Sequence, residues 1–175
     1  MLSHSAKGLG ILLAVLLAPV THASDIGRPA SPEEVKLWDI DVRPDGAGLP
    51  RGRGTVRQGK QLYTVNCEAC HGASGEGGIK DRLVGGQGSL VTSKPIKTIG
   101  SYWPYATTLF DYIRRAMPYT APGTLSNDNV YALVAYLLNL NGIVPANATL
   151  DQNSLPKVTM PNRDGFVPDS VFRLD

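Results

Sequence analysis

The chain has 175 residues, enough for one domain with a buried core. Its net charge is only +2, and it has no basic run with interleaved aromatic residues, so we expect no nucleic-acid partner. The charge is nevertheless uneven, because residues 51–120 hold ten basic and four acidic side chains while both flanks are acidic. This pattern either favours docking on an acidic protein or is ordinary solvated charge.

Residues 1–23 have the features of a signal peptide. Lys7 supplies a basic start, the apolar run Leu9–Val20 follows, and Thr21-His22-Ala23 places small residues where a signal peptidase reads them. We expect cleavage between Ala23 and Ser24 and export to the periplasm. The apolar run is shorter than the ~20 residues that span a bilayer, so we expect no membrane span after cleavage.

Proline and glycine recur through residues 24–54 and predict an extended N-terminal arm, with one or two helical turns at SPEEVKLW. Thr55 can cap a helix that runs into the cysteines. A glycine-rich connection, residues 72–100, comes next. A structureless loop of this length is unusual in a small domain unless a bound cofactor fills its centre.

Two more helices are predicted. One begins near Pro104 and is stopped by Pro118. The other is capped by Ser126, repeats apolar residues at helical spacing and ends at Gly142. Residues 143–175 show no amphipathic pattern and predict a second arm. The fold class is therefore all-α, with three or four helices over residues 55–142.

Both cysteines of the chain lie in the stretch CEACH, Cys67 to His71. A disulfide between cysteines three residues apart would close a very small loop and constrain the unfolded chain little. A zinc site needs four ligands, and the mature chain would offer only these two cysteines and one histidine. A thioredoxin-like switch would need a strand before the motif and a βαβ pattern around it. None of these readings fits.

A covalent haem does fit. In a CxxCH motif the two thiols form thioethers with the haem vinyl groups, and the histidine that follows becomes the proximal iron ligand. We therefore predict one haem c, attached through Cys67 and Cys70, with His71 on the iron.

The second axial ligand has to come from elsewhere. No other histidine remains after cleavage, and the methionines are Met117 and Met160, each followed by proline. Met117 lies between the attachment site and the last helix, so we predict that it is the ligand and that Met160 fills the core. His/Met ligation raises the reduction potential and closes the iron to substrates. It suits single-electron transfer, and we expect no catalytic residue in this chain.

Several other side chains could line the haem or bind its propionates. The aromatic residues near the predicted helices are Tyr63, Tyr102, Trp103, Tyr105, Phe110 and Tyr112. We expect about half of them to pack between helices instead. The basic candidates for the propionates are Lys97, Arg114 and Arg115.

The spacing Gly59-x-x-Leu62-Tyr63-x-x-x-CEACH, a later Met-Pro and the stretch VYALVAYL resemble the class I cytochrome c family over residues 55–142. In that family the first and last helices cross closely, which here would place Gly59 against Tyr136 or Leu137. The stretches WDIDVRPDGAGLPRGRGTVRQG, KTIGSYWPYATTLFDYIRRAMPY and MPNRDGF resemble a narrower group, the cytochrome subunit of sulfane dehydrogenases (SoxD-type). Some members of that group carry two haem domains, whereas this chain has a single CxxCH.

The resemblance implies a function. The partner would be a molybdenum-cofactor subunit that oxidises sulfane sulfur or sulfite, and this chain would pass its electrons to a soluble cytochrome c. Two alternatives stay open: a free-standing cytochrome c that shuttles electrons between other partners, and an enzyme with an open haem iron. The resemblance also leads us to expect that the two arms pack on the haem domain or wrap a partner subunit.

Overall fold

The computed structural model describes residues 27–167, so the expected signal peptide lies outside the described part. The chain divides into two compact units, Met1–Asp39 and Ile40–Asp175. Within residues 27–167 no helix combines the length and apolar character that crossing a membrane requires.

In the described part of the first unit, residues 27–39, the chain forms one helix, α2 (Pro32–Trp38). Ser31 caps it in a reciprocal capping box with Glu34, and Pro32 occupies the first helical position. Arg28 also pairs with the Glu34 carboxylate. These local interactions form the helical turns that the sequence predicts, and no residue of α2 is buried.

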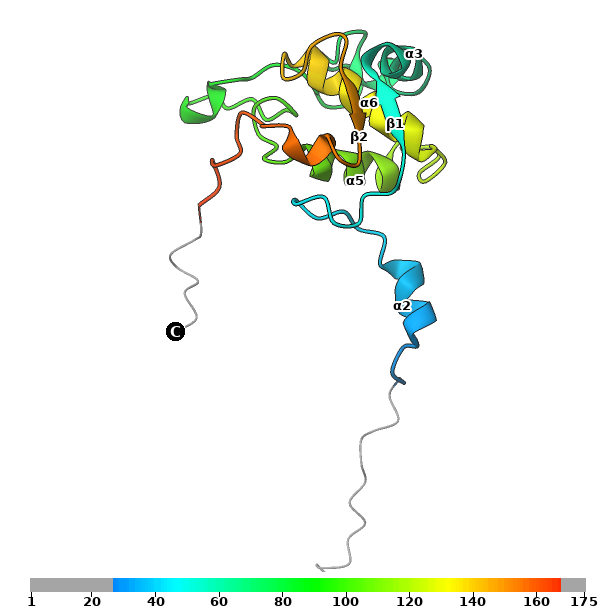
Figure 1. Cartoon of the computed structure of the whole chain (residues 1–175). Coiled ribbons are helices and arrows are strands. Elements are labelled where there is room, and N and C mark those ends of the chain that lie inside the picture. The colour runs from blue at the N-terminus through cyan, green and yellow to red at the C-terminus, as the bar shows by residue number, and fades with distance from the viewer. Residues whose placement is uncertain (1–26, 168–175) are drawn as a thin grey trace, which may run out of the picture. The chain divides into compact units, whose positions relative to one another are not determined.

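The second unit is mostly helical (Figure 1). Its helices are α3 (Val56–Asn66), α4 (Glu68–His71), α5 (Ala106–Ala116) and α6 (Asn127–Leu140). Two short 3₁₀ helices, η1 (Ser89–Val91) and η2 (Leu155–Lys157), lie in the connections. Thr55 and Ser126 accept hydrogen bonds as the predicted caps of α3 and α6, and Gly142 follows α6 with a φ of 71°. Helix α5 starts two residues later than the predicted Pro104.

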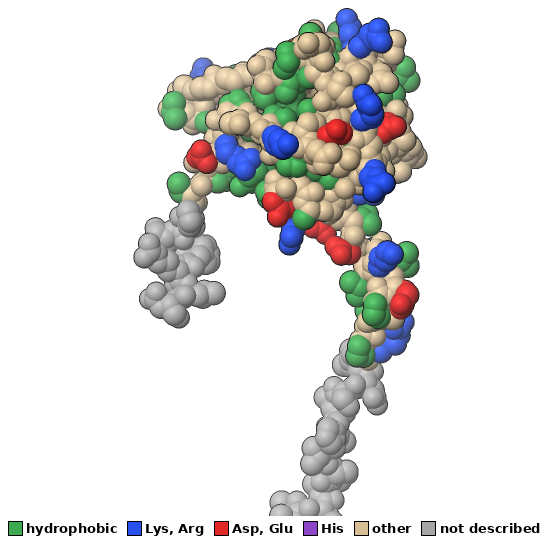
Figure 2. Space-filling model, in the orientation of Figure 1, with side chains coloured by type: hydrophobic (Ala, Val, Ile, Leu, Met, Phe, Trp, Pro, Cys, Tyr) green, Lys and Arg blue, Asp and Glu red, His purple; other side chains and the backbone are tan. Residues whose placement is uncertain are grey.

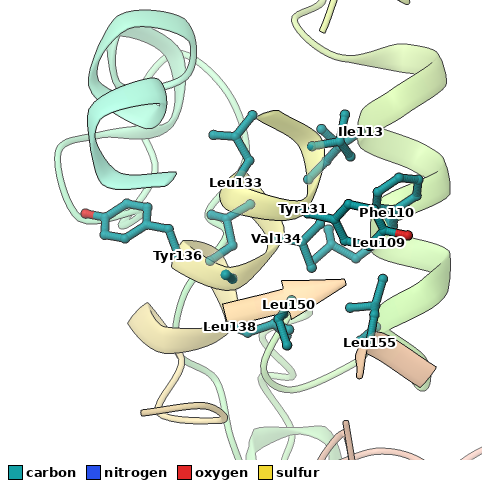
Figure 3. Close-up of a cluster of buried hydrophobic side chains, with 14 of the residues drawn as sticks. Leu109, Phe110, Ile113, Tyr131, Leu133, Val134, Tyr136, Leu138, Leu150 and Leu155 are labelled. Carbon is teal, nitrogen blue, oxygen red and sulfur yellow. The ribbon is translucent and has the colours of Figure 1, made fainter. Parts of the chain in front are cut away.

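Helix α6 is the centre of the core. Every residue from Val130 to Leu138 is buried, because α3, α5, β1 and β2 all pack against this helix. Tyr131 lies against Phe110 of α5 with 4.4 Å between ring centroids, while Tyr136 points the other way, toward α3 (Figure 3). A helix that is apolar all round is a buried helix, and here it sets the positions of its neighbours.

A two-stranded antiparallel sheet joins β1 (Arg53–Thr55) to β2 (Thr149–Asp151), with Gly54 opposite Leu150. The sequence pattern does not predict these strands. Strand β1 lies so close to α6 that a Cβ on Gly54 would come within 2.1 Å of the Ala132 nitrogen. Only glycine allows this approach.

The segments on either side of the helices also contribute to the core. Val42 comes from the N-terminal side, and Leu150, Leu155 and Met160 come from the C-terminal side; all four side chains are buried. Leu150 and Leu155 project toward α6 and α5 in Figure 3.

Helices α3 and α6 cross at a point where no side chain fits between them. A Cβ on Gly59 would lie 1.9 Å from the Ala132 carbonyl oxygen and 2.7 Å from the Tyr136 Cβ. The predicted contact of Gly59 with Tyr136 is therefore present, and Ala132 approaches even more closely.

We predict that Gly59→Ala destabilises the protein by ~2 kcal/mol. Overpacking costs typically about 1–3 kcal/mol, and a Cβ 1.9 Å from a backbone oxygen places the cost at the upper end, from which the gain in helix propensity takes ~1 kcal/mol. Urea unfolding of the holoprotein measures the change. Gln61→Ala, at an exposed position of the same helix, is the control and should stay close to wild type. Equal stability of Gly59→Ala and wild type would contradict the close crossing.

Candidate functional site

The CEACH stretch forms one helical turn at the end of α3. Cys67 closes α3 with its backbone N–H donated to the Tyr63 carbonyl at 2.8 Å, and the N–H of His71 donates to the Cys67 carbonyl at 2.9 Å. Both cysteines are free thiols and both are half-buried. Burial, and secondarily the nearby Cys70, raises the pKa of the Cys67 thiol to about 11. Cys67, Cys70 and His71 are thus brought together on one turn.

The imidazole of His71 is oriented by a backbone carbonyl. Its Nδ1 lies 2.7 Å from the carbonyl oxygen of Asp81. A carbonyl can only accept a hydrogen bond, so Nδ1 carries the proton and donates it. In a neutral imidazole of this tautomer, the lone pair is on the other ring nitrogen, Nε2. Histidine ligands of metals are commonly held in this way, with the second ring nitrogen bonded to an acceptor.

The chain after His71 folds back over the turn. Gly77 donates its N–H to the His71 carbonyl at 2.8 Å, and Lys80 donates to the Cys70 carbonyl at 3.0 Å. Gly72 makes the reversal with a φ of 84°, and a Cβ there would lie 2.6 Å from the Glu76 carboxylate. This return positions the Asp81 carbonyl against the ring.

Met117 follows directly after α5 and has an extended backbone, with φ of −124° and ψ of 147°. This conformation is the one expected for a residue that precedes proline. The side chain is half-buried and packs against the edge of the core. Met160, in contrast, is 1% exposed and lies inside the core cluster. The structure thus places Met117 directly after α5 and the CEACH turn directly after α3, two helices that pack against α6.

Several of the aromatic candidates have packing partners within the protein. Phe110 is a core residue stacked on Tyr131. Tyr63 is buried beside the CEACH turn, where its hydroxyl donates to the Gly72 carbonyl at 2.8 Å and burial raises its pKa. Trp103 and Tyr112 contact each other edge to face, with ring centroids 5.7 Å apart. Packing between side chains therefore accounts for several of these aromatics, as the sequence reading expects.

Two of the basic propionate candidates have other partners. Arg115 pairs with the buried Asp111, and Arg114 donates to the Ile40 carbonyl at 3.2 Å. Asp111 also accepts the N–H of Val42 at 3.1 Å. These side chains bind the segment that precedes β1 to α5. All three basic residues stay candidates for the propionates, and the ammonium of Lys97 lies over the Tyr102 ring.

Sequence reasoning missed two residues next to the site. Asp81 acts through its backbone carbonyl, which any residue would supply, so no side-chain signal exists. Asn141, whose side chain binds the loop after Asp81, stands directly before the Gly142 that ends α6. That place in the sequence indicates a helix end rather than a tertiary contact.

Comparison with known proteins places these features in a family. Residues 54–137 match the family model of cytochrome c oxidase, cbb3-type, subunit III. A chain in the crystal structure of the sulfane dehydrogenase SoxCD from Paracoccus pantotrophus is 46% identical, with a TM-score of 0.77 over 84% of this chain and 73% of that one. The chain belongs to the cytochrome c family. This cytochrome is also 27% identical, over 114 residues and 63% of its length, to a thiosulfate dehydrogenase of Psychrobacter arcticus, of which it spans 35%.

The CxxC pair of this cytochrome implies covalently bound haem c. The residues present fit that group, because two half-buried thiols stand one turn apart and the adjacent imidazole has its Nε2 free. Cys67 and Cys70 would hold the haem through thioethers, and His71 would bind the iron.

Proposed function

We propose that this cytochrome carries single electrons away from a molybdenum-cofactor dehydrogenase that oxidises sulfane sulfur or sulfite. The observation that carries the proposal is the 46% identity to a chain of the SoxCD sulfane dehydrogenase. That likeness extends over 84% of this chain, well beyond residues 54–137 that match the general family model. Similarity to a thiosulfate dehydrogenase supports the same class of chemistry.

One haem c per chain is part of the proposal, with His71 and Met117 on the iron. Bound haem would supply a one-electron redox centre. The Asp81 carbonyl fixes the tautomer and the direction of His71, while Pro118 and the end of α5 hold Met117 extended. Two protein ligands would leave no position for a substrate, so the chain acts as a carrier and the partner performs the oxygen-atom chemistry.

The proposal includes an electron donor and an electron acceptor. Electrons enter from the molybdenum subunit and leave to a soluble cytochrome c in the periplasm, where export through residues 1–23 would place this chain. We assign the haem domain to residues 55–142, with residues 24–54 and 143–175 as its arms. Buried Val42, Leu155 and Met160 support arms that are largely packed on that domain.

Helix α2 is the part of the N-terminal arm that we assign to partner binding. Its apolar side chains are exposed, with Val35 at 52%, Leu37 at 75% and Trp38 at 85% (Figure 2). A helix of seven residues is marginal in water, yet a capping box and an ion pair favour its formation. Tryptophan is enriched among the residues that dominate binding energy at interfaces.

We predict that Met117→Ala abolishes the weak Met-to-iron charge-transfer band of the oxidised protein, because the thioether sulfur is lost from the iron. Absorption spectra of the purified holoprotein test this. Met160→Ala is the control: it should lower stability by about 2–5 kcal/mol, as large-to-small core changes do, but leave the band in place. Loss of the band in Met160→Ala alone would assign the ligand to Met160.

We further predict that the tagged full chain co-purifies with a molybdenum-containing protein, and that Trp38→Ala weakens this complex by about 2 kcal/mol or more. Molybdenum analysis of the purified material and titration of the complex measure the two effects. Val91→Ala, which changes an apolar side chain of 95% exposure elsewhere, is the control and should bind normally. A haem protein recovered without molybdenum would instead indicate a free-standing electron shuttle.

A further inference from the structure

The end of α6 carries a buried amide with all its hydrogen-bonding groups in use. Asn141 is 7% exposed. Its Oδ1 accepts the N–H of Gly85 at 3.1 Å, and its Nδ2 donates to the Leu83 carbonyl at 3.2 Å and to the Leu137 carbonyl at 2.9 Å. The amide therefore fastens residues 83–85 to the last turn of the central helix.

The same loop carries the acceptor for His71. The Asp81 carbonyl, 2.7 Å from the His71 Nδ1, lies two residues before Leu83. Its position is fixed from both directions along the chain. On one side Lys80 donates its N–H to the Cys70 carbonyl at 3.0 Å, and on the other side Leu83 and Gly85 are bound to Asn141.

We propose that Asn141 is a positioning residue for the iron ligand. By holding residues 83–85, it keeps the Asp81 carbonyl within hydrogen-bonding distance of His71. That hydrogen bond raises the basicity of the imidazole. A more basic ligand favours the oxidised iron, so Asn141 lowers the reduction potential without touching the haem ligand. The inference rests on the proposed function in one respect, that His71 binds the iron.

The loop would loosen rather than unfold if Asn141 were replaced. Thr98 donates from its hydroxyl to the Gly85 carbonyl at 2.5 Å, and Ile99 donates its N–H to the Leu83 carbonyl at 3.3 Å. Leu83 also donates its N–H to the Gly75 carbonyl at 2.8 Å. These bonds do not involve Asn141, so haem attachment should survive the substitution.

The test is Asn141→Ala in the holoprotein, read by proton NMR and by redox titration. In the reduced state the His71 Nδ1 proton should exchange about tenfold faster, the factor that corresponds to one weakened hydrogen bond. The reduction potential should shift upward. Asn139→Ala is the matched control, because Asn139 also lies in the last turn of α6 and donates to a carbonyl, that of Val144 at 2.9 Å. It should change neither reading.

Wild-type exchange and an unchanged potential in Asn141→Ala would overturn the proposal and leave Asn141 as a helix cap. Should that variant fail to fold, Asn141→Leu keeps the size of the side chain and removes its hydrogen bonds to Leu83 and Gly85. It should show the same tenfold faster Nδ1 exchange, and wild-type exchange would again contradict the proposal. A wild-type spectrum without histidine ligation would refute the proposed function instead, so the two failures are distinguishable.

Discussion

The close crossing of α3 and α6 is the contact on which the rest of the structure depends. Gly59 lies against the Ala132 carbonyl, and Gly54 lies against the backbone of the same residue. Two glycines from neighbouring elements thus allow β1 and α3 to rest directly on the central helix. Both helices continue past this crossing, α3 to the CEACH turn and α6 to Asn141. The haem attachment site and the residue that supports it therefore depend on one backbone contact.

A second set of contacts surrounds α5, the helix that Met117 follows. Asp111 is buried and binds both Arg115 and the N–H of Val42, while Thr107 donates to the Pro44 carbonyl at 3.2 Å. Removing the partner of a buried charged group leaves that charge unpaired. The loss of stability is far larger than the contribution of a surface ion pair. The segment before β1 is thus part of the haem domain's packing, which explains why a small electron carrier retains so much chain outside its helices.

The sequence predicted the features that depend on local patterns. CEACH indicates the cofactor, and Thr55 and Ser126 mark helix starts. The crossing at Gly59 was implied by the resemblance to class I cytochromes c. The β1–β2 pairing could not be predicted, because each strand has three residues and the partners are far apart in the chain. The charge of Arg114 and Arg115 makes them propionate candidates, but their contacts with Ile40 and Asp111 could not be predicted, because those contacts depend on how the chain folds.

Stopped-flow spectroscopy is the most direct test of the proposed electron entry from a sulfur-oxidising molybdenum subunit. The oxidised complex is mixed with a sulfane or sulfite substrate, and the haem absorption is followed. We expect the haem of the complex to become reduced within one catalytic turnover and the cytochrome alone to stay oxidised. A haem that stays oxidised while the partner turns over with an artificial acceptor would contradict it.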